Sequence, residues 1–237
     1  AAMQQLQEEL SLPRLPTRME CYDISHIQGT NTVASMVVFE DGKPRTSDYR
    51  RFKIKSHDKN DDFASMREVL RRRFARLQKA VEAREAGEAT KDDAFGIVPD
   101  LVLIDGGKGQ LSSALQVMLE LGIEGVPLAS LAKQEEEVFI PDSAEPFILP
   151  RGSQGLFLVQ RIRDEAHRFA ITFHRNLRSK GSRQSALDLV PGIGPKRKKQ
   201  LVRQFGSLKG IREASIDDLA ASPGMTRKLA ERVKENV

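Results

Sequence analysis

The sequence contains no tryptophan, two tyrosines and a single cysteine among its 237 residues. A disulfide needs two cysteines, so Cys21 cannot form one within this chain, which fits a reducing compartment. No apolar run approaches the roughly 20 residues that a membrane-spanning helix needs. The first residues also lack the basic and apolar segments of a signal peptide. We therefore expect a cytoplasmic protein without a membrane segment.

The charges are unevenly distributed along the chain. Hydrophobic residues make up 39% of the sequence and charged residues 30%, which is enough apolar material for a folded core. Residues 1–150 carry 19 basic and 25 acidic side chains, whereas residues 151–237 carry 19 and 8. A strongly basic C-terminal part is what the phosphate backbone of a nucleic acid attracts.

The order of the expected elements predicts an α/β fold, with a mixed sheet flanked by helices. Residues 1–17 are polar, contain Pro13 and Pro16, and are expected to form a linker. Strand character is found in residues 19–24, 32–39, 49–55, 101–104, 127–131, 138–140 and 147–149. Amphipathic helices are expected over residues 61–88, 111–121 and 154–178, the first of them capped by Asp61 or Asp62.

A repeat marks the C-terminal part as a different kind of structure. The segment Leu187 to Lys196 is followed 32 residues later by a second copy, in which Thr226 replaces the second glycine. Each copy resembles a helix-hairpin-helix motif, where glycines and a helix N-terminus approach a phosphate without reading bases. We expect a small all-α domain over residues 184–237. Its expected DNA contacts are Gly192, Gly194, Lys196, Arg197, Lys198, Gly224, Arg227 and Lys228.

Three residues in the larger part predict a metal site. Asp23 lies in the first predicted strand, Asp105 ends the continuously apolar strand, and His167 lies in the last long helix. A carboxylate within a strand is costly to bury unless it is paired or holds a cation. Two carboxylates side by side repel each other, and a divalent ion offsets that repulsion. This combination indicates metal-assisted phosphodiester hydrolysis, with His167 either as a ligand or as a proton-transfer group.

Several ordered motifs carry a family resemblance. They include Glu20 to His26, Leu103 to Leu111 and Arg163 to Phe169, and from about Thr17 onward they resemble the C-terminal half of UvrC, the excision nuclease subunit of bacterial nucleotide excision repair. The resemblance implies a ribonuclease H-like endonuclease domain over residues 18–180, followed by a tandem helix-hairpin-helix domain.

The resemblance also implies an activity. The domain would make the incision 5′ of a lesion in double-stranded DNA, within the SOS response to DNA damage. The family's catalytic set falls on Asp23, Asp105 and His167, with Mg²⁺ or Mn²⁺ as cofactor. UvrB, and indirectly UvrA, are the implied partners, and a monomer is expected.

Other residues and other functions remain open. Lys108 and Lys133 could contact phosphates, although exposed lysines are usually only solvated. Glu68 could approach the metal but is equally placed to pair with Arg71 or Arg72. A nucleoside triphosphatase is disfavoured because the glycine-rich turn after Asp105 lacks the Walker spacing. A DNA-binding module without catalysis, whose aspartates only stabilise the fold, is the main alternative.

Overall fold

The computed structural model describes residues 1–27, 31–55, 61–88, 94–132, 137–188 and 190–236. The chain divides into two compact units, residues 1–172 and residues 173–237. The predicted domain boundaries at 180 and 184 both fall inside one helix, α4 (Gln154–Asp188). None of the described helices is both long enough and apolar enough to cross a membrane.

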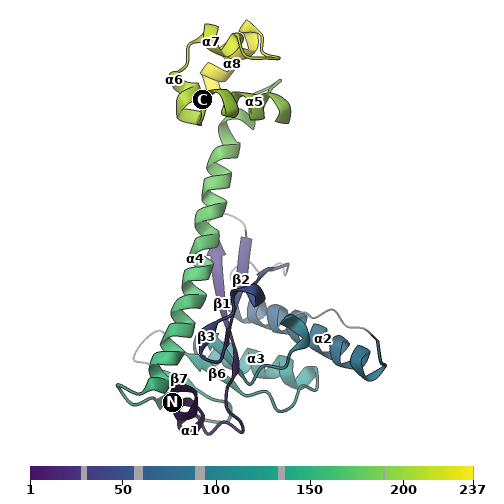
Figure 1. The fold of residues 1–237 in the computed structure, drawn as a ribbon, viewed down its shortest axis with the longest axis vertical. Helices are drawn as coiled ribbons and strands as arrows, with labels where there is room; N and C mark the ends of the chain where they lie inside the picture. Colours follow the sequence, from purple (N-terminus) through teal and green to yellow (C-terminus); the bar gives the residue numbers. More distant parts are fainter. Residues whose placement is uncertain (28–30, 56–60, 89–93, 133–136, 189, 237) are drawn as a thin grey trace. The chain divides into compact units, whose positions relative to one another are not determined.

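The described residues of unit 1 form one mixed sheet, as predicted, and it has eight strands, of which the short β3 was not expected (Figure 1). The strand order is β3-β2-β1-β5-β6-β7-β8, and β4 also pairs with β2. The β1–β5 and β5–β6 pairs are parallel, whereas the other pairs are antiparallel. The strands are β1 (Arg18–Ile27), β2 (Asn31–Glu40), β3 (Lys43–Pro44), β4 (Arg50–Lys53), β5 (Leu101–Asp105), β6 (Leu128–Leu131), β7 (Glu137–Phe139) and β8 (Phe147–Ile148).

Helices cover both faces of this sheet, which explains why all five residues of β5 are buried. On one face lie α2 (Asp62–Glu85) and α3 (Lys108–Glu120), and α4 lies on the other (Figure 1). The predicted cap of α2 is confirmed, because the Asp61 carboxylate accepts hydrogen bonds from the amides of Phe63 (2.9 Å) and Ala64 (3.0 Å). Two short 3₁₀ turns, η1 (Thr46–Asp48) and η2 (Ala94–Gly96), complete the unit.

The linker predicted over residues 1–17 is wrong for its first half. Ala2–Glu9 form the helix α1, and Leu6 and Leu10 are buried in the core of unit 1. The amide of Gln154 donates to the Gln5 side chain (2.7 Å), which joins α1 to the start of α4. Leu6 and Leu10 are four residues apart and therefore lie on one helix face, a spacing that the two nearby prolines obscured.

The described part of unit 2 is a small helical domain with its own core. Its helices after α4 are α5 (Pro195–Phe205), α6 (Leu208–Glu213), α7 (Ile216–Ala220) and α8 (Arg227–Asn236). The buried residues of that core are Leu187, Val190, Ile193, Leu201, Ile211, Leu219, Ala230 and Val233.

A fully buried ion pair joins β1 to α2 in unit 1. Arg73 donates from Nη2 to Glu20 Oε1 (2.7 Å) and from Nε to Oε2 (3.1 Å), and both side chains are 0% exposed. The Tyr22 hydroxyl donates to the same carboxylate at 2.6 Å, and burial, followed by the negative charge of Glu20, raises the pKa of Tyr22. Arg73 also donates to the carbonyls of Phe95 and Ile97. Each charge is therefore paired and hydrogen-bonded, which is the condition for burying it.

We expect Arg73→Met to lower the free energy of unfolding of unit 1 by about 3–5 kcal/mol, because Glu20 would remain buried without its partner. The double variant Glu20→Leu/Arg73→Met should recover much of this loss. Both tyrosines of the chain lie in unit 1, so tyrosine fluorescence during urea unfolding reports on this unit alone. A double variant as unstable as Arg73→Met would contradict the account.

Candidate functional site

Two neighbouring parallel strands bring two aspartates together. β1 and β5 pair with Tyr22 opposite Ile104, so the next residues, Asp23 and Asp105, lie side by side. Side chains alternate along a strand, so both carboxylates point to the face opposite Tyr22. Asp23 is 7% and Asp105 8% exposed. The sheet therefore holds two nearly buried carboxylates on its α4 face.

The third predicted residue comes from α4. Ile162 and Ala166 are buried in the core of unit 1, and the neighbouring His167 is exposed. One oxygen of each aspartate and one ring nitrogen of His167 lie within 4.8 Å of one another. The structure thus brings together the three side chains that were far apart in sequence.

The groups around these carboxylates are a hydroxyl donor, a buried thiol and an arginine. The Ser25 hydroxyl donates to Asp23 Oδ2 at 3.0 Å. Burial raises the pKa of the Cys21 thiol, and the negative charges of Asp105 and Asp23 raise it further, while Arg163 opposes them. Cys21 therefore stays protonated and adds no negative charge beneath the pair.

The donor set fits a hard divalent cation. Carboxylate oxygens suit Mg²⁺ and Mn²⁺, and a neutral imidazole is a common metal ligand. A cation between the two carboxylates would offset the repulsion between two poorly solvated negative charges. Among the described residues, Asp23, Asp105 and His167 are the group of three potential ligands whose atoms come this close.

Two other polar side chains of unit 1, the candidate Glu68 and His26, are engaged elsewhere. The Glu68 carboxylate accepts from the Lys55 amide (3.0 and 3.1 Å) and pairs with Arg72 (3.2 Å), which confirms the alternative of an ordinary helical ion pair. His26 Nε2 lies 2.6 Å from an Asp62 oxygen. Neither side chain belongs to the cluster around Asp23.

The two predicted loop lysines give different outcomes. Lys108 is the first residue of α3, two positions beyond Gly106, and its Nζ donates to the Ala144 carbonyl at 3.1 Å. Its contact with a phosphate stays a prediction. Lys133 lies outside the described residues.

Sequence analysis missed three residues on, or in contact with, the turns of α4 that carry His167. The Tyr49 hydroxyl donates to Glu165 Oε1 at 3.0 Å across 116 residues, a separation that no local pattern reveals. Burial, followed by Glu165, raises the pKa of Tyr49, and Arg168 is the main cause of the lowered pKa of Glu165. Arg163 lies four residues before His167 and so shares its helix face, a spacing that could have been recognised.

The two hairpins of unit 2 repeat each other in structure as well as in sequence. The Ile193 amide donates to the Val190 carbonyl at 3.0 Å, and 32 residues later the Met225 amide donates to the Ser222 carbonyl at the same distance. Gly192 (φ +93°) and Gly224 (φ +78°) occupy the left-handed region at matching positions.

The two hairpins differ at the N-terminus of the following helix. Gly194 caps α5 and has no side chain that could accept from the first amides. At the matching position before α8, the Thr226 hydroxyl accepts from the Leu229 amide at 3.3 Å. Pro195, the first residue of α5, has no N–H group, so the two hairpins leave a similar number of backbone N–H groups available for a phosphate.

Arg197, predicted to contact DNA, joins the two hairpins. Its Nε donates to the Gly224 carbonyl (2.6 Å) and its Nη1 to the Gly192 carbonyl (2.9 Å). A Cβ added to Gly192 would lie 2.7 Å from Leu229 Cδ2, so this hairpin also packs closely on α8. These contacts fix the spacing between the two hairpin loops.

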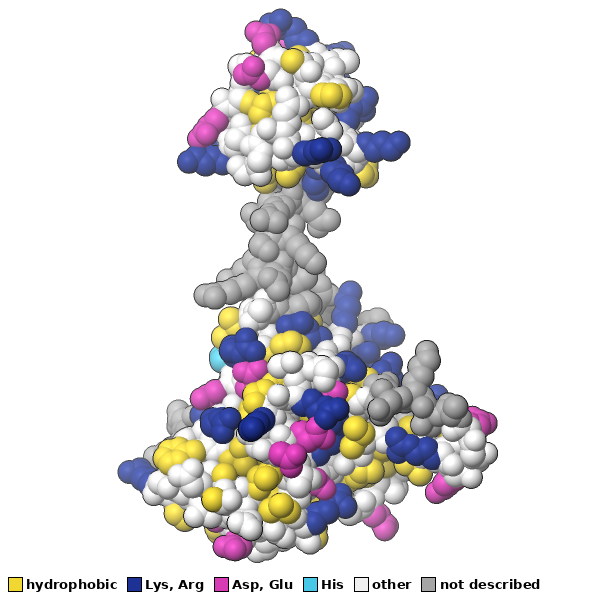
Figure 2. Space-filling model, in the orientation of Figure 1, with side chains coloured by type: hydrophobic (Ala, Val, Ile, Leu, Met, Phe, Trp, Pro, Cys, Tyr) yellow, Lys and Arg dark blue, Asp and Glu magenta, His cyan; other side chains and the backbone are white. Residues whose placement is uncertain are grey.

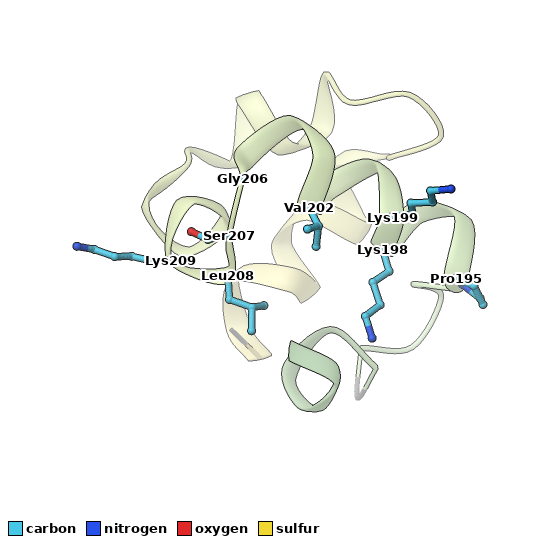
Figure 3. Close-up of a pocket in the computed structure, with 8 residues that line it drawn as sticks. All are labelled: Pro195, Lys198, Lys199, Val202, Gly206, Ser207, Leu208 and Lys209. Carbon is cyan, nitrogen blue, oxygen red and sulfur yellow. The ribbon is translucent and has the colours of Figure 1, made fainter. Parts of the chain in front are cut away.

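The other basic residues predicted to contact DNA lie at the surface of unit 2, and Figure 2 shows lysine and arginine side chains on the visible face of residues 190–236. Gly194, Lys196, Arg197 and Gly224 line one hollow between the hairpins. Lys198 lines a second hollow between α5 and α6, where it points to the same side as Val202 and Leu208 (Figure 3). Arg227 pairs with Asp217 (3.4 Å) and Glu231 (3.6 Å), and Lys228 is exposed.

Comparisons with known proteins agree with this division into two units. Residues 7–171 match the family model of the UvrC RNase H endonuclease domain, and residues 185–236 match the SAM-like helix-hairpin-helix tandem. The crystal structure of human ENDOV is 13% identical and covers 76% of this chain and 96% of its own, with a TM-score of 0.38.

Relatives are similar over almost the whole chain. UvrABC system protein C of Symbiobacterium thermophilum is 55% identical over 98% of this chain and 39% of its own length. The protein of the same name from Corynebacterium jeikeium is 47% identical over 99% of this chain and 38% of its own length. The chain thus spans about two fifths of the length of these curated relatives. A family model that covers most of unit 1, together with relatives about half identical throughout, shows that this chain belongs to the UvrC family, where it matches the C-terminal part.

Proposed function

We propose that unit 1 is a metal-dependent endodeoxyribonuclease that makes the incision 5′ of a lesion in bacterial nucleotide excision repair. The observation that carries this proposal is the convergence of Asp23, Asp105 and His167 within 4.8 Å. Membership in the UvrC family supports the class of reaction. The paired strands β1 and β5 support a site of fixed geometry, because both aspartates belong to the centre of the sheet.

In this proposal the two aspartates hold the metal ion and His167 completes the ligand set from α4. When bound, a divalent ion lowers the pKa of a water molecule and stabilises charge on the leaving oxygen. The nearly buried carboxylates keep their positions because neighbouring strands fix their backbone on both sides. The exposed side of His167 leaves room for a phosphodiester to approach.

We further propose that unit 2 binds DNA without sequence preference. Lys196, Arg197, Lys198 and Lys199 all lie in the first turns of α5, next to the N-terminal amides of that helix. Cations at a helix N-terminus interact unfavourably with its dipole, so this cluster is best explained by an anion that binds there. Backbone amides and lysines reach phosphates rather than base edges, which predicts sequence-independent affinity.

The substrate and partners in this proposal follow from the family. The relatives are named as components of the UvrABC system, and this chain spans about two fifths of their length. We propose that damaged double-stranded DNA is presented to unit 1 by UvrB, after UvrA has acted.

We expect Asp105→Asn to abolish 5′ incision and to weaken Mn²⁺ binding, while DNA affinity is largely kept. The substitution removes one of two charges that hold the ion but leaves the surface of unit 2 unchanged. Mn²⁺ affinity is measured by titration of the free chain, and incision on a lesion-containing duplex with the repair partners present.

Glu68→Gln is the matched control for this variant. It neutralises a carboxylate of unit 1 that pairs with Arg72 instead of the cluster, so incision and Mn²⁺ affinity should stay at wild-type levels. Unchanged Mn²⁺ affinity in Asp105→Asn would instead favour a DNA-binding module without catalysis.

Replacing Lys196, Lys198 and Lys199 by alanine should weaken DNA binding and flatten its salt dependence. The slope of log K against log[salt] should become shallower by roughly 0.9 for each phosphate that the protein no longer neutralises. Fluorescence anisotropy with a labelled duplex at several salt concentrations measures this slope. Lys209→Ala serves as the control, since Lys209 pairs with Glu213 (3.7 Å) and is outside the predicted set. An unaltered slope in the triple variant would rule out this surface.

Arg197→Ala should act differently from the lysine changes. Because Arg197 donates to the carbonyls of both hairpins, its removal should lower the melting temperature of unit 2 as well as DNA affinity. Arg197→Lys keeps the charge but cannot reproduce two directed hydrogen bonds, so it should not restore the melting temperature. A wild-type melting temperature in Arg197→Lys would contradict this role, because it would show that only the positive charge of Arg197 matters.

A further inference from the structure

Tyr49 contacts α4 on both sides of His167. The Tyr49 hydroxyl donates to Glu165, two residues before the histidine, at 3.0 Å. The Tyr49 ring meets the ring of Phe169, two residues after it, edge-on with centroids 5.1 Å apart. Tyr49 is only 9% exposed, so both contacts are largely shielded from water.

Both partners of Tyr49 are themselves held in place. Arg168 donates to the two oxygens of Glu165 at 2.6 and 2.7 Å. The Arg51 guanidinium lies 3.7 Å from the centroid of the Phe169 ring, and its Nη2 donates to the Phe169 carbonyl at 3.1 Å. Tyr49, directly before β4, and Arg51, within β4, thus hold this turn of α4 against the sheet.

The geometry of an α-helix connects this anchor to His167. Successive residues are about 100° apart around the helix axis. Glu165 and Phe169 therefore lie on one flank of the face that packs on the sheet, and His167 lies on the opposite flank. The residues between the two flanks, Ala166 and Ala170, are buried but carry only a methyl group. These small side chains allow close approach, and the larger buried residues of this face, Val159 and Ile162, lie in earlier turns of α4.

We propose that Tyr49 is a positioning residue, which holds Glu165 and Phe169 and so sets the rotation of α4 that presents His167 to Asp23 and Asp105. This inference rests on the proposed function, since it assumes that the three side chains bind a metal ion. Thr172 is the last residue of unit 1, so Tyr49 acts within the final turns of α4 that belong to this unit.

The test is Tyr49→Phe, which removes the hydroxyl and keeps the ring. We expect the Mn²⁺ affinity of the full chain, measured without DNA from the EPR signal of free Mn²⁺, to fall roughly 10-fold, as is typical when a supporting residue of a metal ligand is removed. In the double variant Tyr49→Phe/His167→Ala, the affinity should equal that of His167→Ala alone. A residue that acts through His167 has no further effect once the imidazole is gone.

Tyr22→Phe is the matched control. It also removes a tyrosine hydroxyl that donates to a carboxylate, but on the opposite face of the sheet. Thermal unfolding should show a loss of stability for both variants, whereas the Mn²⁺ affinity should fall for Tyr49→Phe alone. Glu165→Gln, whose amide oxygen still accepts from Tyr49, should bind Mn²⁺ more tightly than Glu165→Ala.

The outcomes separate this inference from the proposed function. If Asp105→Asn leaves Mn²⁺ affinity unchanged, the proposed function fails and the inference fails with it. If Asp105→Asn weakens binding but Tyr49→Phe behaves like Tyr22→Phe, only the inference is overturned. The inference is also overturned if the losses of Mn²⁺ affinity in Tyr49→Phe and His167→Ala multiply in the double variant. Wild-type Mn²⁺ affinity in His167→Ala would overturn it as well.

Discussion

The repulsion between two nearly buried carboxylates is the constraint on which the rest of unit 1 depends. Parallel pairing of β1 and β5 places Asp23 beside Asp105, and the same pairing forms the centre of the sheet. The fold therefore cannot separate the two charges without losing its core. A cation held by both carboxylates would offset this cost, which would link the stability of the unit to the proposed chemistry.

One face of β1 contributes to the buried core of the fold, and the opposite face contributes a residue to the candidate metal site. Its alternating side chains direct Glu20 toward Arg73 of α2, and Asp23 toward α4. The buried ion pair holds one face of the strand, and the opposite face carries the carboxylate that we propose to bind the metal ion. Unit 2 also separates a structural role from a binding role. Arg197 donates hydrogen bonds to both hairpins, whereas the neighbouring lysines lie at the surface.

The sequence predicts most of the sheet, because strands such as 101–104 are continuously apolar, and it predicts the repeat through its fixed offset of 32 residues. It also proposes Asp23, Asp105 and His167 as candidates, and the close approach of these three side chains depends on tertiary packing. Helix α1 was missed because its apolar residues, Ala2, Met3, Leu6 and Leu10, are closely followed by Pro13 and Pro16, which favoured a linker. The bond from Tyr49 to Glu165 joins residues 116 positions apart, and the bonds of Arg197 involve backbone carbonyls, which carry no side-chain signal.

A crystal structure of the chain grown with Mn²⁺ tests the central claim most directly, through the anomalous scattering of the ion. The account predicts an anomalous peak within bonding distance of one oxygen of Asp23, one oxygen of Asp105 and a ring nitrogen of His167. Ordered Mn²⁺ at another place on unit 1, with the two carboxylates holding no ion, would contradict it.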